Sequence, residues 1–277
     1  MIKNIQESLA GRIGILQLYS LSMNELADIH FENELTYSLA SFKQRQKLAK
    51  PNNILDVFNY IWRGGMPEIQ TVDEEVRADY FDAYINTYLM RDAFELGGIT
   101  NSLKFGKLLT ACAALVSEQV SYKNLADAAD ISQPTAKEWL RLLESLGVTY
   151  LLKPYANNEL KRLNKTPKLY FCDTGLCAHL SMWLTPDILR TGAKNGSYFE
   201  NFVVMQLVRA YSYGKTKANL TYYRDANKKE IDLLVEEGQF IHPFEIKLSA
   251  NPKRQEVRKF NVFDKANIKQ GDSGISV

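Results

Sequence analysis

The chain has 277 residues, of which 45% are hydrophobic and 24% charged, and its formal net charge at pH 7 is +2. This composition excludes a collagen-like, disordered or disulfide-scaffold protein, because enough apolar side chain is available to bury a core. At roughly 100–200 residues per domain, the length favours more than one domain. The sequence has no run of ~18–20 apolar residues and no signal-peptide layout at its start, so we expect a cytoplasmic protein without a membrane partner.

Charge is distributed unevenly between the two halves of the chain. Residues 1–150 hold 14 Lys+Arg and 19 Asp+Glu, a net charge of −5, whereas residues 151–277 hold 20 and 13, a net charge of +7. An anionic partner is therefore expected to bind the second half. The three cysteines, Cys112, Cys172 and Cys177, have no Cys or His partners at metal-finger spacing, and we interpret them as reduced core thiols.

The first hundred residues predict a mainly helical region. Residues 5–10 and 12–19 predict the end of a helix and a short strand, and Ser22 is placed to cap the next helix. Residues 51–92 predict helix, with a break at residues 63–67, where two glycines and a proline stand together.

The next segment predicts a winged helix-turn-helix. Apolar residues at helical spacing indicate a helix over 103–116, a short amphipathic helix over 121–129, and a longer helix that begins after Ser132 and ends at Gly147. A strand over 148–152 and a basic loop over 153–168 follow. This order is typical of a winged helix-turn-helix, in which the second helix of the motif reads DNA.

The candidate DNA contacts lie on the second helix of this motif and in the basic loop, since neutralised phosphates supply most of the sequence-independent affinity for DNA. They are Gln133, Thr135, Lys137 and Arg141 on the helix and Lys161, Arg162 and Lys165 in the loop, where Lys153 and Lys168 add further charge. The alternative is a winged helix that packs only against protein, because Glu138 and Glu144 on the same helix face oppose entry into a DNA groove. Both interpretations stay open.

The last third predicts an α/β unit with a carboxylate site. A helix over 196–213 carries Glu200, and strands are predicted over 220–224, 231–235 and 240–248. Because strand side chains alternate, Glu245 and Lys247 project from the same face, and a hairpin can bring Asp232 beside them. The packed helix can add Glu200.

These residue types fit metal-dependent phosphodiester chemistry. Asp232 and Glu245, with help from Glu200, offer hard oxygen ligands for Mg²⁺ or Mn²⁺, which polarises a phosphodiester and activates a bound water. Lys247 can position that water or offset developing charge. An Asp followed 12 residues later by Glu-x-Lys is similar to the PD-(D/E)xK nuclease pattern, with Ile231 in place of its proline. The alternative is a set of surface carboxylates in which Glu245 and Lys247 form a salt bridge.

Seven segments, taken in order, resemble the C-terminal portion of a large prokaryotic group of AAA-type ATPases, in which a P-loop module precedes a winged helix and a PD-(D/E)xK-like domain of unknown function. The segments are residues 7–12 with 18–22, 64–68, 88–92, 167–176, 196–201, 230–234 and 245–247. The resemblance implies a mixed α and α/β protein: a helical region plus a winged helix-turn-helix, followed by a restriction-endonuclease-like α/β domain.

The chain departs from that group because it has no G-x-x-x-x-G-K-[ST] loop. Without such a loop and its lysine to cradle phosphates, we expect neither ATP binding nor ATP hydrolysis by this chain alone. The resemblance divides the chain into a remnant of the ATPase module (1–26), a helical linker region (27–100), the winged helix-turn-helix (101–185) and the nuclease-like domain (186–277). The stop at Val277, where another strand would begin, leaves a truncated last domain or a fragment of a longer reading frame as alternatives.

Two functions follow from these patterns. The first is a DNA-interacting protein whose nuclease-like domain catalyses phosphodiester hydrolysis with Mg²⁺ or Mn²⁺. The second is a non-enzymatic winged-helix module that binds nucleic acid, a protein partner or a second copy of itself. The sequence does not choose between them.

Overall fold

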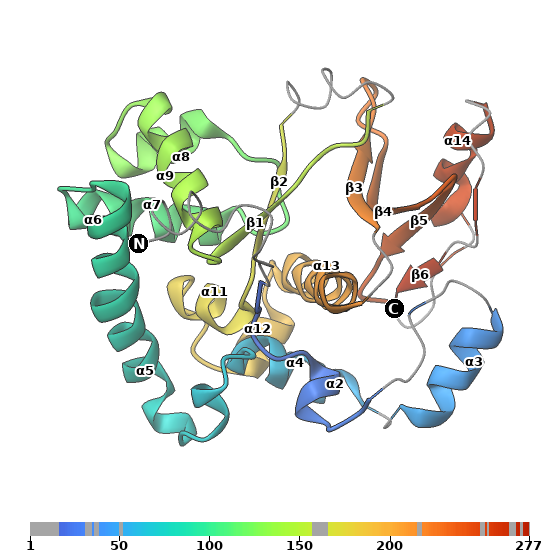
Figure 1. The fold of residues 1–277 in the computed structure, drawn as a ribbon, viewed down its shortest axis with the longest axis horizontal. Coiled ribbons are helices and arrows are strands. Elements are labelled where there is room, and N and C mark those ends of the chain that lie inside the picture. Colours follow the sequence, from blue (N-terminus) through green and yellow to red (C-terminus); the bar gives the residue numbers. More distant parts are fainter. Residues whose placement is uncertain are drawn as a thin grey trace, which may run out of the picture.

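The computed structural model describes residues 17–30, 35, 39–49, 52–156, 166–214, 218–249, 253, 255–265, 270–271 and 274–276. Figure 1 shows a mostly helical part on one side and a four-stranded sheet on the other, with helix α13 (Asn195–Tyr213) between them. The fold is therefore a mixture of helices and small sheets, as the sequence predicts at this level. Among the described residues, no helix is long and apolar enough to cross a membrane.

The N-terminal helical region contains the expected break. Asn53 caps α4, whose first-turn Asp56 completes a capping box, and Gly64 ends the helix at φ +85°, a conformation that disfavours any residue with a Cβ. The elements of this region are α2 (Met23–Leu26), α3 (Leu39–Leu48), α4 (Ile54–Arg63), η1 (Glu68–Gln70), η2 (Glu74–Val76), α5 (Arg77–Ala83), the π-helix η3 (Tyr84–Leu89) and α6 (Met90–Gly97). The helix and strand expected before residue 17 lie outside the described residues.

The three helices predicted over 103–146 are confirmed. They are α7 (Ser102–Ala114), α8 (Tyr122–Ala129) and α9 (Gln133–Ser145), and Ser121 and Ser132 cap the second and third through their side-chain oxygens. Strand β1 (Thr149–Leu152) then pairs antiparallel with β2 (Lys168–Phe171). Gln119, just before α8, forms a β-bridge with Lys168. The two-stranded sheet of β1 and β2 thus lies next to the helix pair α8–α9.

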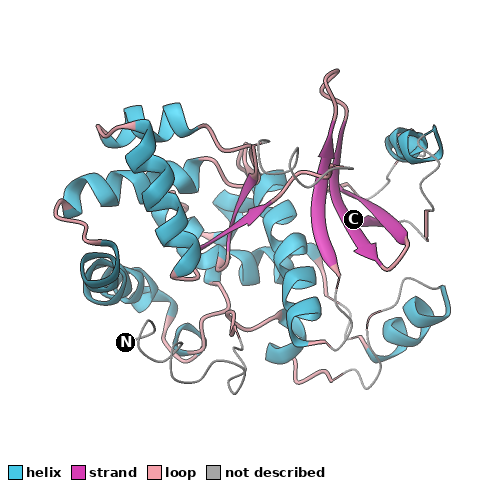
Figure 2. Ribbon diagram, turned by 45° about the horizontal axis from the view of Figure 1, so that its top comes forward, coloured by secondary structure: helices cyan, strands magenta, loops and turns pink. Residues whose placement is uncertain are grey.

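The predicted C-terminal strands are also confirmed and lie in one sheet of order β3-β4-β5-β6. Strands β3 (Asn219–Arg224), β4 (Glu230–Glu237) and β5 (Phe240–Ile246) are antiparallel neighbours, and β6 (Gly274–Ser276) runs parallel to β5. Helices α11 (Thr174–Leu180), α12 (Pro186–Thr191) and α13 precede this sheet, and η4 (Glu256–Phe260) and α14 (Asn261–Lys265) lie between β5 and β6. Figure 2 shows the β1–β2 ribbon between the helices and this sheet.

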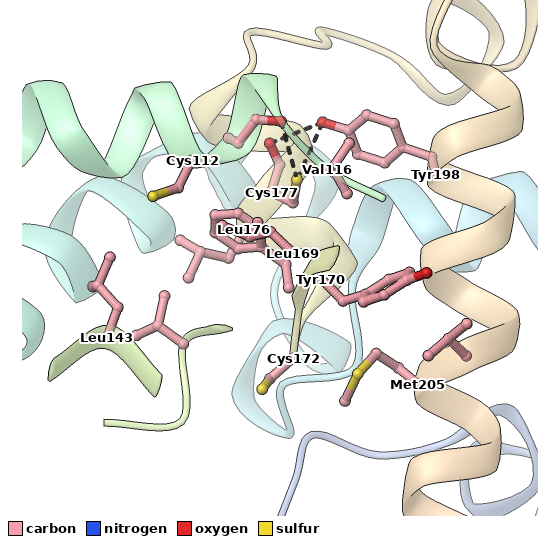
Figure 3. Packing of buried hydrophobic residues seen from close by; sticks show 14 of the residues in the cluster. Cys112, Val116, Leu143, Leu169, Tyr170, Cys172, Leu176, Cys177, Tyr198 and Met205 are labelled. Atoms are coloured by element: carbon pink, nitrogen blue, oxygen red, sulfur yellow. Dashed lines mark hydrogen bonds between the residues drawn. The ribbon is translucent and has the colours of Figure 1, made fainter. Parts of the chain in front are cut away.

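One apolar cluster extends from α4 through the helix-turn-helix to β5, with fully buried members such as Phe58, Leu140 and Tyr170. The three cysteines belong to it and form no disulfide, as predicted (Figure 3). Tyr198 donates a 3.1 Å hydrogen bond to the carbonyl oxygen of Cys177, which ties α13 to α11. The helical region, the helix-turn-helix and α13 therefore share a core.

Candidate functional site

The β4–β5 hairpin brings Asp232, Glu245 and Lys247 together. Leu233 pairs with Phe244 in the antiparallel register, so the preceding Asp232 lies beside Glu245. Lys247 Nζ lies 2.6 Å from Glu245 Oε1 and 3.5 Å from Asp232 Oδ2. Asp232 Oδ2 also accepts a 2.8 Å hydrogen bond from the backbone N–H of Ile246. The strand alternation therefore predicts this convergence correctly.

A second lysine covers Glu245 from outside the hairpin. Lys259 lies on η4, and its Nζ makes an ion pair with Glu245 Oε2. We name Asp232, Glu245, Lys247 and Lys259 the carboxylate–lysine cluster. From the sequence, Lys259 belongs to a basic run with Lys253, Arg254 and Arg258 that suits a phosphate backbone or a solvated helix face, and nothing in that run indicates that Lys259 turns toward a distant carboxylate.

In the carboxylate–lysine cluster, the carboxylates are buried and the ammonium groups are partly exposed to solvent. The side chains of Asp232 and Glu245 are 8% and 2% exposed, whereas those of Lys247 and Lys259 are 39% and 21% exposed. Burial, together with the charge of Asp232, raises the pKa of Glu245. Burial lowers the pKa of Lys247, but the attraction of Glu245 and Asp232 outweighs it and raises that pKa above its ordinary value. Asp232 and Glu245 are therefore buried, unlike the surface carboxylates of the alternative interpretation, whereas the ion pair between Glu245 and Lys247 that this interpretation expects is present.

Glu200 belongs to a neighbouring network centred on Lys168. Lys168 Nζ lies 2.8 Å from Glu200 Oε1 and 2.7 Å from Glu230 Oε1, and the hydroxyl of Tyr170 donates a 2.7 Å hydrogen bond to Glu200 Oε1. Arg224 Nη1 contacts the other oxygen of Glu230 at 2.7 Å. We name these five residues the Lys168 network. Burial raises the pKa of Glu200 and the charge of Asp232 adds to this, against the opposing attraction of Lys168, so the network and the cluster are electrostatic neighbours.

The expectation that Lys168 adds to the charge of the basic loop is wrong. Lys168 is 3% exposed and is the first residue of β2, and its ammonium group points at α13 and β4. Two carboxylates compensate the cost of burying this charge. A phosphate in solution has no access to it.

The predicted reading face is only partly described. Gln133, Lys137 and Arg141 are exposed on α9. Thr135 is half-buried, and its hydroxyl shares a 2.7 Å hydrogen bond with that of Ser132 at the helix N-terminus. Lys137 Nζ lies 5.9 Å from the ring centre of Tyr122. The loop candidates lie outside the described residues: Lys161, Arg162 and Lys165.

Two segments of the family resemblance, residues 64–68 and 167–176, contact each other in the interior of the protein. Asp173 caps α11 and also accepts a 2.8 Å hydrogen bond from the backbone N–H of Gly65. The backbones approach so closely that a Cβ on Gly175 would lie 2.3 Å from the carbonyl oxygen of Arg63, and one on Gly64 would lie 2.4 Å from Asp173 Oδ1. Packing of α4 against α11 accounts for these residue types.

The cluster could hold a divalent cation by the chemistry of its donors. Two buried carboxylates, Asp232 and Glu245, are the hard oxygen ligands that Mg²⁺ and Mn²⁺ prefer. Glu200 is engaged by Lys168. Within the described residues, no group of three or more His, Cys, Asp or Glu side chains is arranged to hold a metal. A cation at this site would thus bind two carboxylates and complete its coordination with water or substrate oxygens.

Two family models match separate parts of the chain. Residues 54–187 match the domain of unknown function DUF8612, and residues 195–277 match the domain of unknown function DUF4143. DUF4143 is a domain found at the C-terminus of AAA-ATPase-like proteins. The first match spans much of the helical region and the helix-turn-helix, and the second begins with α13 and includes the carboxylate–lysine cluster.

Curated relatives come from mycobacteria. The chain is similar to the uncharacterized protein Rv2008c of Mycobacterium tuberculosis and to the uncharacterized protein Mb2031c of Mycobacterium bovis, with 29% identity over 248 residues in each case. The alignment covers 89% of this chain and 49% of each relative, so the chain spans about half the length of the curated relatives it matches. No solved structure matches the chain significantly.

Proposed function

We propose that this protein binds DNA and hydrolyses phosphodiester bonds with a divalent cation held by Asp232 and Glu245. The observation that carries the proposal is the convergence of two buried carboxylates on one lysine at the end of a β-hairpin. Carboxylates gathered on otherwise apolar strands, with the pKa of Glu245 raised by burial and by the charge of Asp232, are typical of a functional site. The residue set matches the PD-(D/E)xK pattern in kind and in order.

The architecture around the cluster supports this proposal. Helix α13 precedes three antiparallel strands, and a short helical segment precedes the parallel strand β6. This arrangement puts the carboxylates on the two central strands of a four-stranded sheet, where the backbone fixes their positions. The helix-turn-helix, with Lys137 and Arg141 exposed on α9, supports DNA as the phosphodiester.

Three side chains of the cluster, those of Asp232, Glu245 and Lys247, have a definable task in hydrolysis. The cation would polarise the phosphodiester and lower the pKa of a bound water. Asp232, held by the backbone N–H of Ile246, and Glu245 fix the cation. Lys247, the more exposed of the two lysines, reaches the solvent side of both carboxylates, where its ammonium group can orient the attacking water and offset negative charge on the phosphorus.

The test is plasmid nicking with Mn²⁺ by the wild type, Asp232→Asn and Lys247→Met. Nicking by the wild type that falls at least about a hundredfold in both variants supports the proposal. Asp79→Asn, which changes an exposed carboxylate on α5, is the matched control and should nick like the wild type. Nicking that persists in Asp232→Asn and in Lys247→Met would show that a contaminating nuclease cuts the plasmid. It would reject the assignment of these residues to hydrolysis.

A non-enzymatic binding module is the second candidate. One observation favours it: both carboxylates of the cluster are already neutralised by lysines, as in a structural ion-pair network. In that case the protein binds DNA in a salt-sensitive manner and cleaves nothing, with or without Mn²⁺. A filter-binding series in increasing NaCl, run beside the nicking assay, separates the two candidates.

A further inference from the structure

Glu245 is covered by two ammonium groups that come from different parts of the chain. Lys247 follows β5 and lies 2.6 Å from Glu245 Oε1, whereas Lys259 belongs to η4 and contacts Glu245 Oε2. With Asp232, the cluster holds two carboxylates and two ammonium groups and has no net charge. A divalent cation that approaches Glu245 therefore meets two positive charges as well as two negative ones.

Lys247 and Lys259 differ in the ion pairs that they would lose by moving away from Glu245. Lys247 contacts both carboxylates, so it keeps a partner in Asp232 if a cation takes its place on Glu245. Lys259 makes its ion pair with Glu245, and its side chain, 21% exposed, lies near solvent. Glu245 lies on β5 and its side chain is 2% exposed, so its carboxylate cannot move with Lys259 toward solvent. Lys259 is thus the group that a cation displaces.

We infer that Lys259 is a built-in competitor of the divalent cation for Glu245, and that it sets how weakly the site binds Mg²⁺ or Mn²⁺. This inference rests on the metal site of the proposed function and adds a specificity-determining residue to it. Cation binding requires the Lys259 ammonium group to leave Glu245.

The first test measures Mn²⁺ affinity by isothermal titration calorimetry on the full chain. Lys259→Met removes the charge and keeps the length of the side chain, so it should bind Mn²⁺ at least about tenfold more tightly than the wild type. Arg258→Met removes the charge of an exposed neighbour on η4 and should leave the affinity within about twofold. An unchanged or weaker affinity in Lys259→Met, or no Mn²⁺ binding by either protein, overturns the inference.

Circular dichroism confirms that the variants are folded, and Lys259→Gln replaces Lys259→Met if the latter is not. The second test needs no substitution. Acetylation of the wild type with an amine-reactive ester, followed by mass spectrometry, should label Lys259 faster when Mn²⁺ is present, while the buried Lys168 stays unlabelled in both conditions. Equal labelling of Lys259 with and without Mn²⁺ contradicts displacement.

These readouts are independent of catalysis. Tighter Mn²⁺ binding by Lys259→Met in a protein that nicks no DNA supports the competitor role and rejects the proposed hydrolysis. Nicking that depends on Asp232, with equal Mn²⁺ affinity in the wild type and Lys259→Met, supports the proposed hydrolysis and rejects the competitor role.

Discussion

Lys168 Nζ lies 2.8 Å from Glu200 Oε1, and this ion pair joins strand β2 to helix α13. Both side chains are largely buried, at 4% and 15% exposure. Glu230 on β4 completes the contact from a third element. The two parts of the molecule are thus held together by a shared charge as well as by the apolar core.

Lys168→Met should lower the free energy of unfolding by about 3–5 kcal/mol, because it leaves the largely buried carboxylate of Glu200 without its cation, whereas Glu230 keeps Arg224. Urea denaturation followed by circular dichroism measures the change. Lys153→Met removes an exposed lysine nearby and should alter stability by no more than about 0.5 kcal/mol. A decrease of less than about 1 kcal/mol in the free energy of unfolding of Lys168→Met would show that the ion pair does not stabilise the fold.

The stability that Glu200 contributes should fall with rising pH. Burial raises its folded-state pKa above the ordinary value of 4.5, so proton binding favours the folded state. That contribution is complete below pH 4.5 and is lost as the pH rises through the folded-state pKa. The difference in unfolding free energy, wild type minus Glu200→Gln, should therefore decrease from pH 4.5 upward. Urea titrations at pH steps measure it, and a difference that grows with pH contradicts the prediction.

The cysteines should be unreactive in the folded protein. Burial raises the pKa of Cys172 and of Cys177 to about 12 and also raises that of Cys112, so few thiolates exist at pH 8. A disulfide-exchange reagent should titrate no thiol in the native protein and three in denaturant. One fast thiol in native buffer would mean that this part of the core opens.

Gly64→Ala should destabilise the protein by at least about 2 kcal/mol. The residue has φ +85°, and its Cβ would lie 2.4 Å from Asp173 Oδ1, so both the backbone and the contact oppose it. Gly196→Ala in α13 is the matched control: its Cβ would meet no atom within 4 Å, and the helix gains up to about 1 kcal/mol. Thermal unfolding compares the two, and equal midpoints would refute the close packing of α4 on α11.

If the proposed DNA binding uses α9, Arg141→Glu should weaken duplex DNA binding and reduce the slope of log affinity against log salt by about one unit or more, because an exposed positive charge on α9 is reversed. Fluorescence anisotropy at several salt concentrations measures both quantities. Lys43→Glu reverses an exposed charge on α3, at the opposite end of the molecule in Figure 1, and should leave the slope unchanged. Equal effects of the two substitutions would remove α9 as the DNA-binding face.

The sequence alone determined helices α7 to α9, strands β1 and β3 to β5, and one local piece of the site. Periodic apolar residues, capping serines and glycines fixed α8, α9 and their turn, because helix formation depends on neighbours within a few residues. Strand alternation likewise put Glu245 and Lys247 on one face and their hairpin brought in Asp232.

Only the tertiary structure decided which charges meet across distant segments. Lys168, expected to add charge to the basic loop, is the buried partner of Glu200, and Lys259 is the second ammonium group on Glu245. No local pattern distinguishes these lysines from their neighbours. Their partners are chosen by the packing of β2 on α13 and of η4 on the sheet, where burying a charge is tolerated only opposite a carboxylate.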